Sequence, residues 1–428
     1  MKGNFQNIFL AIFIAGGILG VLVFSGTIPI GKKNSLGGQG TVVLWGTINQ
    51  QLILPAVDDF NRVNTDFVLK YVQKDPVTFD QDLLEALASG NGPDLFFLPD
   101  NLIHHYQNRI LTIPYTSLPI ATFKTSFVGA SDVFLSSKGI TALPLYVDPM
   151  VMYYNRSILD ANNIVNPPAT WDELQNLIPV LTKKDQNNKI IKSAVALGQF
   201  SNISHAKDII STLFMQAGNS IVAEQNGLYY SSLASGPVSL DSFLKFYTDF
   251  ANPLNTSYSW NKSLPVSINS FSSEDVAFYF GYSSELPVLV NKNPNQNFLV
   301  APMPQFKNSK TKVTFGHVTG VAISSASKNS TAAFTVAGIL TNGTFFSKIF
   351  GQLSVVPARR DLLTVKPTDA YFPIFYSSAL FAKSWSDPST LDTDIIFQGM
   401  IDNILSGNMV ISNALSDASM KLSLLLAK

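Results

Sequence analysis

An apolar run that contains two prolines, followed by a helix start, is the feature that most constrains the fold. The run covers residues 142–154 and includes Pro144 and Pro149. Because proline lacks a backbone N–H and has a fixed φ, we expect a strand here and not a helix. Further on, Thr170 and Glu173 have the spacing of a capping box. The sequence therefore predicts a long buried strand and, after it, a new helix that begins at Thr170.

One acid, Asp148, lies inside this apolar run, where charges are rare unless they have a partner or a task. The run reads Leu-Pro, an aromatic residue, the acid, apolar residues and Tyr-Tyr-Asn, and Pro-Pro and Thr-Trp-Asp-Glu-Leu follow it. This pattern resembles the hinge segment of the extracellular solute-binding proteins of ABC importers, in the maltose-binding-like branch. The resemblance implies a periplasmic-binding-protein-like α/β fold with two lobes joined by a multi-strand hinge. The alternative is an ordinary buried strand in which Asp148 pairs with a basic neighbour.

Length and charge narrow the class of protein. A chain of 428 residues exceeds what one core usually supports, so two lobes are expected. Its 29 basic and 29 acidic residues balance, which argues against a nucleic-acid partner. With no cysteine, the chain has no disulfide, no thiolate metal site and no cysteine for a lipid anchor.

The N-terminal segment predicts a membrane anchor. Residues 8–24 are almost wholly apolar, and a helix of this length reaches most of a hydrocarbon core about 30 Å thick. The stretch is long for a signal peptide and lacks an A-x-A-like cleavage site, which favours an uncleaved transmembrane helix over a cleaved signal. We therefore expect a cytoplasmic tip and signal anchor over residues 1–33 and a linker over 34–40. The family resemblance implies that the rest of the chain lies outside the cytoplasm, at the cell membrane.

The first lobe shows an alternation of strands and helices. Strands are expected at residues 41–45, 66–72 and 94–98, and helices at 48–63 and 78–88, the second helix with a capping box at Thr78. This order implies right-handed crossovers and a parallel sheet. Ligands of such sheets bind beyond the carboxyl ends of the strands. Five residues at these ends are expected to contact a ligand: Trp45, Thr47, Asn49, Asp100 and Asn101. A buried position for Trp45 in the core is equally compatible with the sequence.

The second lobe and the returns to the first follow from the resemblance. It implies lobes of residues 41–147 plus 283–341 and 148–282 plus 342–428, with strands near 273–283 and 298–304 and helices near 206–217, 331–340, 394–405 and 410–425. Where relatives have tryptophan after a glycine, this chain has Tyr282. The remaining expected ligand contacts are Asp148, Phe200, Tyr282, Ser283, His317, Arg359 and Trp385.

The resemblance implies a non-enzymatic protein that captures a carbohydrate by hinge closure and delivers it to the permease of an ABC importer. A carboxylate such as Asp148 can accept hydrogen bonds from adjacent hydroxyls, and aromatic faces can bury the apolar side of a sugar ring. Three alternatives remain open: a polyamine or other small-solute binder, a carbohydrate receptor without transport, and a glycosidase that uses Asp100 and Asp148. No cofactor is expected, and the adjacent His104 and His105 do not form a metal site, because neighbouring helical side chains diverge.

Overall fold

The computed structural model of this chain describes residues 40–225, 227–307, 309, 311–342, 345–365 and 367–427. The expected anchor and most of the expected linker lie outside these residues. Within them, no helix combines the length and the apolar character needed to cross a bilayer.

The chain forms two compact units, each built from separate stretches of sequence. Of the described residues, unit 1 comprises those in the stretches 40–147 and 318–364, and unit 2 comprises those in the stretches 148–317 and 365–427. The chain thus passes between the units after Val147, His317 and Thr364. The expected lobes placed the second and third passages at 282/283 and 341/342. The second passage lies later because residues 298–302 form a strand that pairs antiparallel with residues 151–155, well inside unit 2.

Unit 1 contains a sheet in the order β2-β1-β3-β13-β6, with β14 paired to β6. The pairs β1–β2 and β1–β3 are parallel, as the alternation of strands and helices predicts, whereas β13 runs antiparallel to β3. Its strands, including those shared with unit 2, are β1 (Gly40–Gly46), β2 (Phe67–Gln73), β3 (Leu95–Pro99), β4 (Leu135–Ser136), β5 (Gly139–Ile140), β6 (Leu143–Asn155), β13 (Thr314–Ile323) and β14 (Val356–Pro357).

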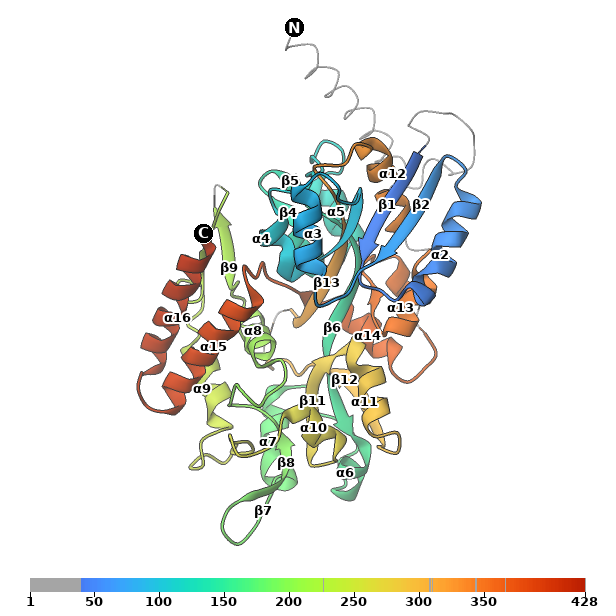
Figure 1. The fold of residues 1–428 in the computed structure, drawn as a ribbon. Helices are drawn as coiled ribbons and strands as arrows, with labels where there is room; N and C mark the ends of the chain where they lie inside the picture. The colour runs from blue at the N-terminus through green and yellow to red at the C-terminus, as the bar shows by residue number, and fades with distance from the viewer. Residues whose placement is uncertain are drawn as a thin grey trace. The chain divides into compact units, whose positions relative to one another are not determined.

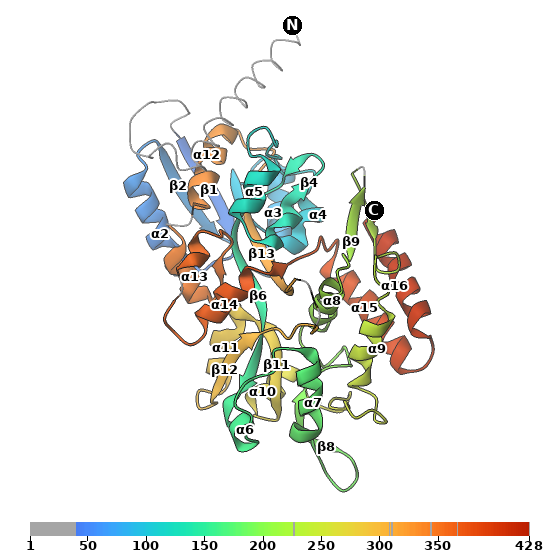
Figure 2. The same cartoon turned by 180° about the vertical axis from the view of Figure 1, so that it is seen from behind.

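Helices flank this sheet. Helix α2 packs against β2 and α12 against β1, and α13 packs against α2 (Figure 1 and Figure 2). The helices of unit 1 are α2 (Gln50–Val63), α3 (Phe79–Ala88), α4 (Ile103–Tyr106), α5 (Ile120–Ser126), α12 (Ser330–Leu340) and α13 (Ser347–Leu353), with 3-10 turns η1 (Asp100–Leu102), η2 (Gly129–Phe134) and η4 (Leu362–Thr364).

Unit 2 uses the second half of β6 as its central strand. Residues 150–154 of β6 pair antiparallel with β11 and residues 151–155 pair antiparallel with β12, and β11 continues to β8 and β7. The last strand, β7, is an edge strand of two exposed lysines, and charged side chains of this kind discourage pairing with another sheet. The strands are β7 (Lys183–Lys184), β8 (Ile190–Val195), β9 (Val222–Gln225), β10 (Leu228–Ser231), β11 (Val276–Tyr282), β12 (Phe298–Pro302) and β15 (Ala382–Lys383).

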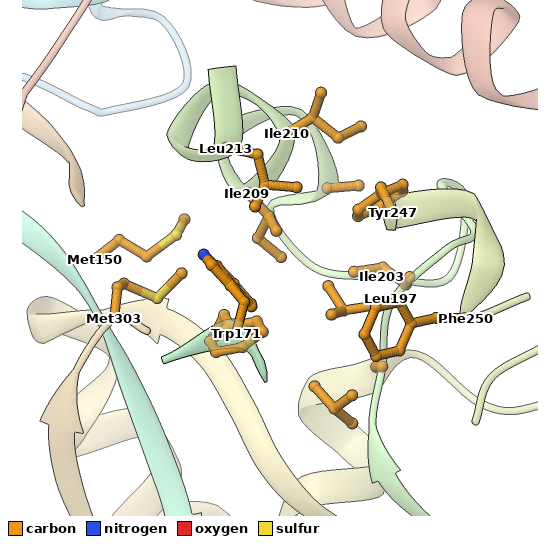
Figure 3. Close-up of a cluster of buried hydrophobic side chains, with 14 of the residues drawn as sticks. Met150, Trp171, Leu197, Ile203, Ile209, Ile210, Leu213, Tyr247, Phe250 and Met303 are labelled. Carbon is orange, nitrogen blue, oxygen red and sulfur yellow. The ribbon is translucent and has the colours of Figure 1, made fainter. Parts of the chain in front are cut away.

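The helices of unit 2 enclose one large apolar cluster. Trp171 is almost fully buried in it, and its indole Nε1 donates to Gln216 Oε1 at 2.7 Å; Figure 3 shows part of the cluster. Helices α15 and α16 pack against each other (Figure 1). The helices are α6 (Arg156–Ala161), α7 (Trp171–Leu181), α8 (Ala206–Gln216), α9 (Asp241–Asp249), α10 (Ser267–Ser272), α11 (Leu286–Lys292), α14 (Phe372–Ala379), α15 (Thr390–Leu405) and α16 (Ile411–Leu426), with the 3-10 turn η3 (Ser283–Glu285).

One of the two predicted capping boxes forms. At the start of α7, the Glu173 N–H donates to Thr170 Oγ1 at 3.3 Å, and the Thr170 N–H donates to Glu173 Oε2 at 3.3 Å. At the start of α3, Thr78 makes no capping bond with its side chain, because its backbone already has helical angles (φ −101°, ψ −4°) where a cap normally has extended ones. The prediction for Thr78 was therefore wrong.

This difference supplies a first testable prediction. Thr170→Ala should lower the free energy of unfolding by about 1 kcal/mol, because an N-cap side chain is lost. Thr78→Ala is the matched control: the same substitution at a helix start without a side-chain cap should change stability by less than about 0.5 kcal/mol. Urea unfolding of both variants measures the difference, and equal losses would contradict it.

Candidate ligand-binding site

The carboxyl ends of β1 and β3 carry the polar residues of unit 1 that the sequence singled out. Trp45 is half-buried near the end of β1, and Lys74 Nζ lies 3.7 Å from the centre of its ring, a cation–π arrangement. Asn49 is the N-cap of α2, where its Oδ1 accepts from the Gln51 N–H at 2.8 Å. Thr47 lies between them and is half-buried.

Asp100 and Asn101 follow directly after β3, the parallel neighbour of β1. Asp100 is almost fully buried, at 3% exposure. Its Oδ1 accepts from the Asn101 N–H at 3.0 Å, and its Oδ2 accepts from the Val318 N–H at 3.3 Å. Since Val318 is the first residue of unit 1 on the return strand β13, Asp100 fixes the backbone at that passage.

Arg359, also in unit 1, is paired inside its own loop. Its guanidinium donates two hydrogen bonds to Asp361, at 3.0 and 2.8 Å. These hydrogen bonds lower the pKa of Asp361 below its ordinary 3.8, against the effect of burial. The charge of Arg359 is therefore matched by a neighbour two residues along the chain.

Asp148 is the first residue of unit 2 on β6 and is half-buried. Its Oδ1 accepts from the Ser283 hydroxyl at 2.7 Å and from the Ser284 N–H at 3.0 Å. Burial raises the pKa of Asp148 above its ordinary 3.8, although these hydrogen bonds and the nearby His317 oppose the rise. The nearby His317 is a basic side chain whose charge acts on Asp148, so the alternative in which Asp148 pairs with a basic neighbour stays open.

Tyr282 ends β11, immediately before the serines that hold Asp148. Its hydroxyl donates to Asp208 Oδ2 at 2.7 Å, and its ring is only 5% exposed. Two histidine rings flank it: His205 edge-on at 4.7 Å and His317 tilted at 4.9 Å, measured between ring centres. His317 is the last residue of unit 2 before β13 passes into unit 1.

Three further polar side chains of this cluster were not anticipated from the sequence: His205, Asp208 and Glu285. His205 Nε2 lies 2.9 Å from Glu285 Oε1. Glu285 Oε2 also accepts from the Tyr279 hydroxyl and the Tyr282 N–H, both at 3.0 Å. The spacing of Tyr282 and Glu285 resembles a capping box and could have pointed to Glu285. Nothing local in the sequence connects it to His205.

Phe200 and Trp385 are placed by apolar packing. Phe200 packs against the core cluster of unit 2 and is half-buried. Trp385 is 6% exposed and stacks on Phe397, with ring centres 6.4 Å apart. Both rings therefore fill the unit 2 core or its margin.

The chemistry available at these residues is hydrogen bonding. Asp148 offers carboxylate oxygens, and Ser283 and Ser284 orient them. Across the described residues, no group of three or more His, Asp or Glu side chains has a geometry suited to a metal ion. His105 forms a surface pair with Asp80 at 3.2 Å.

The family of the chain follows from comparison with known proteins. Residues 45–342 match the model of the family described as bacterial extracellular solute-binding protein. This range covers well over half of the sequence, so the chain belongs to that family, as the hinge-segment motif predicts. The family is one of extracellular binding proteins.

Individual similarities are more distant. A presumed binding protein of Brucella abortus (strain 2308) is 27% identical over 99 residues, and this match spans 22% of the chain and only 23% of that relative. Two solved structures show the same fold. A cyclo/maltodextrin-binding protein complexed with maltotetraose has a TM-score of 0.73 at 18% identity, covering 91% of this chain and 98% of its own. The cyclic alpha-maltosyl-1,6-maltose binding protein from Arthrobacter globiformis has a TM-score of 0.74 at 15% identity, covering 90% and 98%.

Proposed function

We propose that this chain is an extracytoplasmic solute-binding protein, anchored in the cell membrane by residues 8–24, that captures a carbohydrate by hinge closure and delivers it to an ABC importer. The two units act as the two lobes, and the three passages of the chain act as the hinge. Membership of the family and the fold shared with saccharide-binding structures support this assignment. The observation that carries it is Asp148, a half-buried carboxylate at a passage between units, held in place by Ser283 and Ser284.

A neutral, hydroxyl-rich ligand suits this carboxylate. A hydrogen bond between a hydroxyl and a charged group contributes about 1.5–3 kcal/mol, roughly twice a neutral one. A sugar hydroxyl can supply such a bond, whereas an anionic ligand would be repelled by the carboxylate, whose ionisation burial already disfavours. Asp148 therefore acts as the principal acceptor for ligand hydroxyls.

We propose that two groups of residues contact the ligand. The group in unit 1 lies at the carboxyl ends of parallel strands, and the group in unit 2 surrounds Asp148. Arg359, Phe200 and Trp385 are left out, because the first is paired with Asp361 and the other two pack in or against the core. The proposed contacts are Trp45, Thr47, Asn49, Asp100, Asn101, Asp148, Tyr282, Ser283 and His317.

Glu285 and Asp208, the other acids of this cluster, already have local partners, which disfavours a polyamine. Glu285 faces His205, and Asp208 accepts from Tyr282 and lies in the field of Lys207. Asp148 is held by Ser283 and Ser284, with His317 as the nearby basic group, so it is one acid of this cluster that could face an ammonium group of a ligand. A polyamine would need several such acids to replace the hydration of its ammonium groups.

A thermal-shift screen of the part of the protein from residue 38 onward tests the proposal. The panel should include maltotetraose, smaller saccharides, polyamines, amino acids and inorganic anions. A ligand present at a hundred times its dissociation constant should stabilise the folded state by about 2.7 kcal/mol. We expect a response to a neutral saccharide. A response confined to polyamines would replace the proposal, and turnover of the bound saccharide would show an enzyme.

A further inference from the structure

His205 has an unusual backbone conformation directly before helix α8. Its φ is +59° and its ψ is +29°, which is the left-handed region that non-glycine residues seldom adopt. Such a conformation is mildly strained and persists only where surrounding contacts hold it. Histidine is one of the few residue types enriched there. The side chain of His205 must therefore contribute contacts that compensate for the backbone.

Those contacts centre on Glu285. One carboxylate joins two elements through three contacts: with His205 before α8, with the Tyr279 hydroxyl on β11, and with the N–H of Tyr282 at the end of β11. The side chains of His205 and Glu285 are 26% and 17% exposed, so their interaction is only weakly screened by water. Removing the positive charge of His205 would leave Glu285 without a cation at this junction.

Ser283 and Ser284, the two residues after Tyr282, connect the contacts of Glu285 to Asp148. Tyr282, whose N–H is held by Glu285, is followed by Ser283 and Ser284, which donate the two hydrogen bonds to Asp148. Helix α8 holds the ring of Tyr282 from its other side, because Asp208 accepts from its hydroxyl. The position of the turn over residues 282–284 thus depends on contacts made by the first turn of α8.

We infer that His205 is a proton-dependent positioning residue for this candidate site: its protonated side chain holds Glu285 and thereby the turn over residues 282–284 that orients Asp148. His205 itself does not contact the ligand in this scheme. The inference rests on the proposed function only in taking Asp148 as a ligand-binding residue, because the turn and its contacts are present without a ligand.

The charges that face His205 set the direction of the pH dependence. They are Glu285 on η3, Asp208 on α8 and His317 on β13; on β11, the Tyr282 ring contacts His205 and the Tyr279 hydroxyl donates to Glu285. Burial alone would lower the pKa of His205, but Glu285 and Asp208 raise it above its ordinary 6.5. Because the folded value is the higher one, the stabilisation is complete below about pH 6.5 and is lost as the pH rises through the folded value.

Amide hydrogen exchange of the full-length, ligand-free protein tests this inference. The peptide that covers residues 279–286 should lose protection, after correction for intrinsic rates, as the pH rises from 6 to 9. The expected loss is about tenfold for each unit by which the folded pKa exceeds the unfolded one. His205→Gln keeps a donor within reach of Glu285 but cannot titrate, so its protection factors should not change with pH. His205→Asn, which tolerates the left-handed backbone but is too short to reach Glu285, should show low protection at every pH.

The control variant is His105→Gln, which removes another histidine that pairs with an acid, Asp80, in unit 1. It should keep the pH profile of the wild type at residues 279–286. The inference would be overturned if His205→Gln showed the pH profile of the wild type, or if the protection factors of the wild type did not depend on pH.

Binding of maltotetraose, measured by calorimetry between pH 6 and 9, provides a second readout. We expect its affinity to fall with rising pH in the wild type and to stay level in His205→Gln. If maltotetraose does not bind at any pH while the exchange profile behaves as expected, the choice of ligand fails and the positioning role of His205 stands. If it binds with the same pH dependence in both proteins, the positioning role fails.

Discussion

Asp148→Asn is expected to weaken saccharide binding by roughly 10- to 100-fold while raising the thermal stability of the ligand-free protein. The loss of affinity follows because hydrogen bonds from ligand hydroxyls to a charged acceptor, about 1.5–3 kcal/mol each, become neutral ones. The shape of the side chain is retained, and its carbonyl oxygen can still accept from Ser283 and Ser284.

The gain in stability has a separate cause. Burial raises the pKa of Asp148, so the folded protein binds a proton at this residue more readily than the unfolded chain does. Between the ordinary value of 3.8 and the folded value, stability therefore falls as the pH rises, and at neutral pH the charge of Asp148 opposes folding. Asparagine removes this charge and should therefore stabilise the ligand-free protein. Residues that serve function often lower stability in this way.

Calorimetric titration with the saccharide found in the screen and thermal unfolding without ligand measure the two effects. The control is Asp275→Asn, which removes an exposed acid of the same unit that pairs with Lys192 at 2.7 Å. It should leave both quantities nearly unchanged. A loss of stability in Asp148→Asn, or an affinity equal to that of the wild type, would count against the role assigned to Asp148.

Lys207→Met is expected to lower the free energy of unfolding of unit 2 by about 3–5 kcal/mol. Lys207 is a buried lysine on α8, 7% exposed, with its Nζ 2.8 Å from Asp387 and 3.0 Å from Asp394. It also donates to the Thr393 hydroxyl at 3.0 Å. Methionine keeps most of the volume but leaves Asp387, itself 10% exposed, buried without a cation.

Two further variants separate this cause from a general loss of packing. Lys192→Met breaks an ion pair in which the side chains are 46% and 47% exposed, and should cost less than about 1 kcal/mol. Adding Asp387→Leu to Lys207→Met removes the unpaired acid and should restore a substantial part of the lost stability. Urea unfolding of the single and double variants decides the matter: no recovery in the double variant would point to lost packing instead.

Local signals predicted the elements of this fold well. The strand over residues 142–154 is present as β6, because its prolines and apolar residues leave no other regular structure. The capping box at Thr170 formed, since it needs only residues within one turn. The same motif at Thr78 did not form, because capping also requires an extended backbone at the first residue, which the side chains do not specify.

The site was only partly accessible from sequence. A lone acid in an apolar strand is conspicuous, so Asp148 could be singled out. Its partners Ser283 and Ser284 are brought to it by the antiparallel pairing of β11 with β6, which no local pattern encodes. His205 and Glu285 are 80 residues apart in sequence, and neither stands out by its neighbours. Similarly, the burial of Trp385 against Phe397 depends on the packing of α15, so an aromatic residue expected at a ligand became part of the core.

The division of each unit into separate stretches of sequence has a consequence for biosynthesis. Strand β3 needs β13 as its antiparallel neighbour, and β6 needs β14, so the sheet of unit 1 stays incomplete until residue 357 has left the ribosome. At about 5–20 residues per second, the early strands wait for many seconds with an unpaired, apolar edge. We therefore expect nascent chains of this protein to bind chaperones, and fragments that end at Val147 to aggregate instead of folding.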